Sequence, residues 1–494
     1  MKKSNTTRYL CAAAQIDRTF RTQVLEKILD EEYRVISIPA GVDLLAVAKH
    51  CLDAKRRKLI RNIIISILFI IAWISAYGSI SSGFEYGYTD PFSAFYLSIF
   101  SSFFSFYFLL AWAAVVFETW MTRYQIIAKS LLKQNFNPDG ATLTPEAEAE
   151  IRRKLSGVTN EEECNVVIYS GFSPFVGSGT DIGGWSFTLD MSKGKEEMRV
   201  AQKPESFTVE ELYSYIDSDI KKLHLQGTSI QDKIFVNGQE IRGDERFLPD
   251  LFHRPLTQVD SSTLKEFVGG QSDGIRHYKC IRIISWQGEI ILSVFLRFLK
   301  LRQNLFVEAS YFFLPPLKQE YRKIDGIQPN PTWRQLIQIL QETFVKSLFL
   351  FPFAIFLLSG ELFRPLARWS QRRSIRRLIR ENPMFDYGAS TSIRELAASN
   401  LYSHYFQKLD KEMYLKLIER QILDSIINFL DAHNIDTSDL KARQETILNN
   451  GVIVTGGSVE AQNLTVGERA KSVMNNMTQA ASSVTGAQSN SSKS

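Results

Sequence analysis

The sequence predicts a membrane protein. It has an N-terminal two-helix transmembrane hairpin, a cytoplasmic α+β domain with a mainly antiparallel sheet, a C-terminal helical region and a short β-prone segment. Two uncharged apolar stretches, 62–84 and 91–117, are each long enough for the roughly 20 residues that a helix needs to cross a bilayer. Basic residues flank the pair. Segments rich in β-branched and aromatic residues follow between 165 and 313.

Composition divides the chain into parts of different character. They are an N-terminal cytosolic helical segment (1–58), the transmembrane hairpin (59–117, with spans at about 62–82 and 92–117), the α+β domain (134–340), a short apolar segment (344–363), a basic amphipathic and helical region (364–448), a β-prone motif (449–471) and a disordered tail (472–494).

Bulk composition excludes several classes of function. A net charge of +5 over 494 residues is modest and does not indicate a nucleic-acid partner. The six histidines include no pair at metal-ligand spacing, so we expect no metal site and no cofactor. The four cysteines are far apart and form no CxxC motif, which favours free thiols in a reducing compartment: Cys11, Cys51, Cys164 and Cys280.

The flanking charges predict the orientation of the hairpin. Six Lys or Arg residues lie between 49 and 61, and three more lie between 123 and 133. The connecting loop, 78–92, contains Glu85 and Asp90 but no Lys or Arg. The positive-inside rule therefore places the N-terminus and the main soluble domains in the cytoplasm, with the chain multi-pass in the inner or plasma membrane.

A third apolar run, 347–360, is too short for an ordinary span. Its 14 uncharged residues cover about 21 Å as a helix, and Pro352 lies inside it. Arginines follow at once, and a crossing would put them outside. We interpret 344–363 as a re-entrant or interfacial segment, with a true third span as the alternative.

The arginine segment is amphipathic at helical spacing, and we expect it to lie on an anionic inner leaflet. The alternative is a solvated helix that pairs with acids elsewhere in the protein. The membrane-surface candidates are Arg364, Arg368, Arg372, Arg373, Arg376, Arg377 and Arg380.

Local patterns in the soluble parts predict further elements. Thr208 and Glu211 form a capping box that opens a helix. Asn237-Gly238 indicates a hairpin between short strands. The segment 411–430 has one apolar stripe, which is more typical of internal packing than of a coiled-coil seam. Strands are expected at 165–170, 185–191, 278–286, 289–298 and 304–313, with a tight turn at 287–288.

The loop GFSPFVGSGTDIGGW, 171–185, is the candidate ligand site. Glycine-rich loops after strands can surround a phosphate with backbone amides. The loop has neither a Walker lysine nor a Rossmann fingerprint, and a long ordered turn packed on the sheet explains the same residues. The ligand-binding candidates are Gly171, Gly177, Gly179, Asp181 and Trp185.

Four stretches carry a resemblance: TRYLCAAA, GVDLLAVAKHCL, GFSPFVGSG and ILNNGVIVTGGSVEAQNLTVG. With these, the chain resembles a family of uncharacterised bacterial membrane proteins with two spans, a likeness that implies no activity. The last stretch is similar to C-terminal tags on bacterial signalling or defence proteins, which implies an interaction role.

No catalytic signature is present, so the sequence favours a non-enzymatic role. We expect a membrane-anchored sensor or scaffold that binds a cytosolic partner or a small ligand and forms a homo-oligomer. The alternative is a membrane-bound enzyme, or a nucleotide- or phosphate-binding protein that uses the loop 171–185. The expected partners include a lipid bilayer with an anionic inner leaflet and exclude nucleic acid.

The β-prone motif generates the first testable prediction. Val452, Val454, Val459 and Val466 contribute to apolar faces of short strands that are too small to be stable alone. Stacking between chains would pair their backbone groups and bury these faces. Deleting residues 449–494 is expected to reduce the oligomer size measured in detergent. An unchanged size, with a synthetic peptide that stays monomeric, would favour the alternative, a hairpin docked on its own chain.

Overall fold

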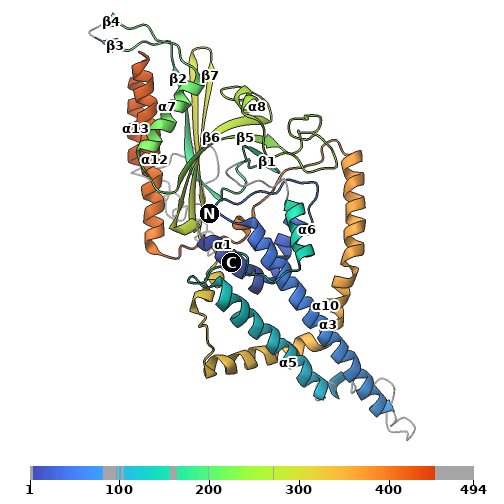
Figure 1. Ribbon diagram of the computed structural model, residues 1–494. Helices are drawn as coiled ribbons and strands as arrows, with labels where there is room; N and C mark the ends of the chain where they lie inside the picture. The colour runs from blue at the N-terminus through green and yellow to red at the C-terminus, as the bar shows by residue number, and fades with distance from the viewer. Residues whose placement is uncertain are drawn as a thin grey trace, which may run out of the picture. The chain divides into compact units, whose positions relative to one another are not determined.

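The computed structural model describes residues 4–81, 96, 99–101, 105–155, 164–197, 200–270 and 272–450. These residues fold into two compact units. Figure 1 shows the helices and strands of the chain. Unit 1 contains 1–180, 223–297 and 312–415, and unit 2 contains 181–222, 298–311 and 416–494. The four valines of the β-prone motif and the tail lie outside the described residues.

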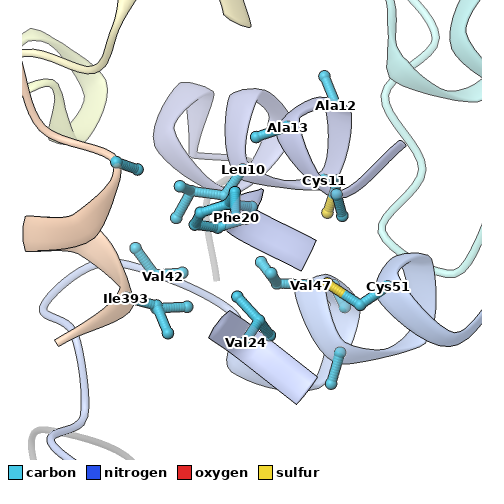
Figure 2. Close-up of a cluster of buried hydrophobic side chains, with 14 of the residues drawn as sticks. Leu10, Cys11, Ala12, Ala13, Phe20, Val24, Val42, Val47, Cys51 and Ile393 are labelled. Carbon is cyan, nitrogen blue, oxygen red and sulfur yellow. The ribbon is translucent and has the colours of Figure 1, made fainter. Parts of the chain in front are cut away.

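Three short helices at the N-terminus belong to unit 1: α1 (Asn5–Ile16), α2 (Arg18–Val24) and the π-helix η1 (Leu25–Leu29). Asp17 caps α2 by accepting hydrogen bonds from the backbone N–H groups of Thr19 and Phe20. Figure 2 shows Leu10, Phe20 and Val24 in one buried cluster with Val47, Cys51 and Ile393. The expected helical segment 1–58 is therefore packed with parts of the chain more than 300 residues away. All four cysteines are buried and free, as their spacing predicted.

Two long helices of unit 1 are apolar enough to cross a membrane by length and composition: α3 (Leu44–Ser81) and α10 (Trp333–Glu381). A third apolar helix, α5 (Phe106–Trp120), continues into the π-helix η3 (Met121–Leu131). Much of the predicted second span, 92–117, lies outside the described residues, so the structure supports the apolar helices without establishing the hairpin itself.

The segment that the sequence divided at 363 and 364 is one helix. α10 begins at a capping box formed by Thr332 and Gln335 and contains Pro352 and Pro365. Figure 1 shows that α10 changes direction along its length. Proline removes a helical hydrogen bond and clashes with the preceding turn, so Pro352 and Pro365 are the residues that favour a bend in this helix. Arg242 Nη1 donates to the carbonyls of Ile379 and Asn382 at the other end, at 3.0 Å each.

The six-stranded sheet has the order β1-β5-β6-β7-β8-β2. β1 pairs with β5 in parallel, whereas β5–β6 and β6–β7 are antiparallel, so the expectation of a mainly antiparallel sheet is confirmed. β3 and β4 form a separate two-stranded sheet. The strands are β1 (Val166–Tyr169), β2 (Thr180–Asp190), β3 (Glu196–Glu197), β4 (Val200–Ala201), β5 (Thr228–Asn237), β6 (Ile275–Ser285), β7 (Ile290–Leu301) and β8 (Asn304–Leu314).

The predicted hairpin at Asn237-Gly238 is wrong. A turn is present, since the Asn237 side chain accepts a hydrogen bond from the backbone N–H of Gln239 at 3.1 Å. The antiparallel partner of β5 is β6, which begins only at Ile275. The tight turn predicted at 287–288 is confirmed: the 3₁₀ turn η4 (Trp286–Gly288) joins β6 to β7.

The remaining helices include two that the sequence predicted well. α7 (Val209–Lys222) starts at the capping box of Thr208 and Glu211. α12 (Tyr405–Ala432) buries its whole predicted stripe, Leu415, Ile418, Ile422, Ile426 and Phe429, which confirms internal packing. The others are α6 (Pro145–Leu155), α8 (Ser261–Glu266), α9 (Gln319–Arg322), η5 (Lys323–Gly326), α11 (Ile393–Leu396) and α13 (Ser438–Asn450).

Candidate functional site

The glycine-rich loop binds a carboxylate of the same protein chain, the side chain of Glu395. The backbone N–H groups of Gly177 and Gly179 donate to Glu395 Oε1 at 2.9 and 3.0 Å. Both glycines have positive φ, and a Cβ on Gly179 would lie 2.2 Å from the carbonyl oxygen of Phe313. The loop therefore needs glycine at this position. Converging amides favour negative charge, and here a carboxylate supplies it.

Glu395 is positioned by the helix that it caps. It belongs to α11, where the Ser392 side chain accepts from the N–H of Glu395, and the N–H of Ser392 donates to Glu395 Oε2 at 2.8 Å. One carboxylate thus satisfies backbone donors from two segments more than 200 residues apart. An external phosphate at Gly177 and Gly179 would have to displace Glu395.

The other three predicted ligand residues make different contacts. Gly171 has positive φ and is exposed. Asp181 and Trp185 belong to unit 2 and to strand β2, whereas Gly177 and Gly179 belong to unit 1. The Asp181 side chain accepts from the N–H of Gly183 at 2.8 Å. Trp185 is buried, and its ring stacks on Phe187 with centroids 5.1 Å apart.

The apolar helices of unit 1 form a second candidate site. Phe351 of α10 is fully buried between Phe69 of α3 and Phe108 of α5, with ring centroids 5.1 and 5.4 Å away. Ala72 and Ala111 are also buried in this cluster and allow close packing. Many apolar side chains on the outer faces stay exposed, among them Ile67, Ile74, Leu109, Phe349, Phe353 and Phe356. An exposed apolar surface of this extent is typical of a membrane contact.

Ion pairs surround one end of this helix cluster. Arg61 of α3 pairs with Glu118 of α5 at 3.1 Å. Arg123, just beyond α5, pairs with Glu342 of α10 at 2.6 Å. Burial alone would raise the pKa of the Glu342 carboxyl, but the hydrogen bond and charge of Arg123 hold it below its usual range.

The far part of α10 returns to the same end of the cluster. Glu361 pairs with Lys55 of α3 at 3.5 Å, and Lys55 precedes the apolar part of that helix. Fourteen residues separate Lys55 from Phe69, which is about 21 Å of helix. Thus Glu342 and Glu361 both contact the charged flanks, while Phe351 between them contacts the apolar interior. The change of direction along α10 makes this path possible.

Four arginines of α10, spaced four residues apart, face an acidic segment near the N-terminus. Arg364 lies 3.6 Å from Glu26, Arg368 2.7 Å from Asp30 and Arg372 2.6 Å from Glu32. Arg376 continues the row by donating to the Tyr33 hydroxyl at 2.8 Å. This arginine row follows one face of the helix, because residues four apart are neighbours on a helix surface.

The acidic partners were missed in the sequence analysis. The stretch EKILDEE, 26–32, contains four acids and complements the row, but over 330 residues separate the two segments. The alternative interpretation, arginines paired with acids elsewhere in the protein, therefore describes Arg364, Arg368 and Arg372. Arg373 and Arg377 are exposed on other faces of the helix, where a membrane surface stays a prediction. Arg380 continues the row, is exposed, and lies over the ring of Phe252 at 6.0 Å from its centroid.

The division of the arginines predicts two different mutant effects. Arg368→Gln should lower the thermal unfolding midpoint of the full-length chain in detergent, because it loses the partly exposed pair with Asp30, worth about 0.5–1 kcal/mol. Arg377→Gln is the matched control on an exposed face and should leave the midpoint unchanged. Adding Asp30→Asn to Arg368→Gln should cost little more. Equal destabilisation by the two arginine variants would contradict the assignment of Arg368 to an ion pair and of Arg377 to an exposed face.

Comparison with known proteins assigns a family. No curated protein and no solved structure matches the chain. A family model described as AbeC-like domain matches residues 184–461, which is more than half of the sequence. The match contains α10 with all seven arginines, and it begins after Gly177 and Gly179. The chain belongs to the family of AbeC-like domain proteins.

Proposed function

We propose that this protein is a membrane-anchored sensor or scaffold in which α10 couples the bilayer to the cytoplasmic sheet. One observation carries the proposal: a single helix contributes to two separate cores of unit 1. Phe351 and Ala354 are buried with α3 and α5, whereas Ile379 is buried with Val166 and Ile234 of the sheet. A shift of the apolar half must therefore strain the packing at the other end.

The re-entrant placement of 344–363 gains support from the contacts at its two ends. Glu342 and Glu361 pair with Arg123 and Lys55, and both partners flank the same end of the apolar cluster. In a bilayer, such a path keeps the charged residues at one surface and inserts the bend near Pro352 into the hydrocarbon region. A helix satisfies its own backbone groups, which makes partial insertion feasible.

The basic residues on these flanks predict how the chain is oriented in the membrane. The positive-inside rule favours the cytoplasmic side for Lys55, Arg61 and Arg123, and hence for the N-terminus and the sheet. On this side, Arg373, Arg377 and Arg380 would meet an anionic inner leaflet. The exposed Leu366 and Trp369 on the same helix would add apolar contact with lipid.

A partner for the soluble part completes the proposed role. We expect a cytosolic protein or a small ligand to bind the soluble part with an affinity that depends on the conformation of the sheet. We also expect the segment 449–471 to form homo-oligomers. The alternative, a nucleotide- or phosphate-binding protein that uses 171–185, has less support because Glu395 already accepts from the amides of Gly177 and Gly179. A phosphate could bind these amides only after the Glu395 carboxylate had left them.

The coupling predicts a response of the sheet to bilayer thickness. Hydrogen exchange of the segment 375–389 is measured for the full-length chain in nanodiscs of short-chain and long-chain phosphatidylcholine. Hydrophobic mismatch costs fractions of a kcal/mol per Å, so we expect a difference of about 1 kcal/mol, or about fivefold in exchange rate. Exchange of α7 in unit 2 serves as the internal reference.

Two substitutions at one position provide the control. A Cβ on Gly360 meets nothing within 4 Å, so Gly360→Ala should keep the helix and the response. Gly360→Pro breaks the helix between its two halves, at a cost of about 3 kcal/mol, and should abolish the response. A wild-type segment 375–389 that exchanges equally in both bilayers would reject the coupling.

A further inference from the structure

A basic pocket lies where the N-terminal helices meet the charged end of the apolar cluster. Its volume is about 270 Å³, and it is lined by α2, α3 and α10. This volume can hold several water molecules, and it is large enough for a phosphate group. Six of the lining residues are basic, against one acid, Glu361: they are Arg18, Arg21, Lys55, Lys58, Arg61 and Arg364.

The cations of the pocket fall into two groups. Lys55, Arg61 and Arg364 pair with carboxylates of Glu361 or Glu118. Arg21 and Lys58 donate to carbonyls at the end of α1: Arg21 Nη1 lies 3.0 Å from the oxygen of Ala14, and Lys58 Nζ lies 3.2 Å from that of Gln15. Within the described part of the chain, no carboxylate lies within ion-pair distance of either cation.

The surroundings of Lys58 are partly buried and mostly cationic. Burial, followed by the charge of Arg21, lowers the pKa of Lys58 to about 7. Burial also lowers the pKa of Arg21, which is 5% exposed. Arg21 is buried and Lys58 is partly buried, and two such cations close together repel each other unless an anion joins them.

Four leucines also line the pocket. Leu350 and Leu357 of α10 line it, together with Leu25 and Leu59. A free phosphate would leave these side chains facing water, whereas an amphiphile would place its charged group at the cations and its chain along the leucines. The lining therefore favours a lipid over a soluble anion.

We propose that this pocket binds the phosphate group of an anionic membrane lipid, with Arg21 and Lys58 as its main ligands and Arg18 at the mouth. The inference rests on the membrane placement in the proposed function and names the ligand that α10 would respond to. The lipid phosphate would join α2, α3 and α10, so its presence would restrain the apolar half of α10.

The test titrates the full-length protein in detergent and follows the thermal unfolding midpoint. The probes are dioctanoyl phosphatidylglycerol, dioctanoyl phosphatidylcholine and inorganic phosphate. We expect a saturable shift with phosphatidylglycerol that the other two do not give at the same concentration. Lys58→Met and Arg18→Met should each weaken it about fivefold in Kd, which corresponds to roughly 1 kcal/mol per basic residue.

Arg56→Met is the matched control, because Arg56 is exposed on α3 near Lys58 and does not line the pocket. It should leave the affinity unchanged, and Lys58→Arg should retain binding. Equal losses for Arg56→Met and Lys58→Met would overturn the proposal in favour of diffuse surface charge. An equal shift with inorganic phosphate would overturn the lipid assignment. If lipid binds but the sheet does not respond to bilayer thickness, the proposed coupling through α10 is rejected. The proposed lipid site is then retained.

Discussion

Ion pairing along α10 determines where this helix can lie, and much of unit 1 depends on it. Arg123, Lys55 and the acids of 26–32 contact α10 from Glu342 to Arg372. Each pair alone contributes little in water, but a row of pairs at four-residue spacing fixes the rotation and register of the helix. Between the pairs, Phe351 is left to pack among Phe69 and Phe108, where no charge could be accommodated.

Two parts of the chain each bring together groups that favour an anion, and the groups differ between the two places. At the glycine loop, unpaired backbone amides meet the carboxylate of Glu395, so the loop is internally satisfied. At the pocket beneath α2, Arg21 and Lys58 donate to carbonyl oxygens. The sequence analysis considered the first place the candidate anion site, because glycines after a strand are conspicuous. The second combines residues from three helices and has no local motif.

Local signals were reliable wherever local chemistry decides the structure. The capping box at Thr208, the turn at Gly288 and the stripe from Leu415 to Phe429 each depend on neighbours within a few turns. Partner choice over long separations could not be predicted. Asn237-Gly238 produces a turn, yet the partner of β5 begins 37 residues later. Pro352 is evident in the sequence, but only the ion pairs of Glu342 and Glu361 relate the path of α10 to α3 and α5. The anion-binding residues of the pocket are basic like many others near them, so only their three-dimensional grouping distinguishes them.

The central claim is that α10 enters and leaves the membrane on one side. Sidedness tests this most directly, with single cysteines at Arg334 and Gln371, two exposed positions before and after the apolar part of α10. The wild-type chain, whose four cysteines are buried, is the blank. An impermeant maleimide is applied to right-side-out and to inside-out vesicles. The account predicts that both cysteines react only in inside-out vesicles. Reaction of the Gln371→Cys variant in right-side-out vesicles, with Arg334→Cys protected there, would contradict it and establish a third span.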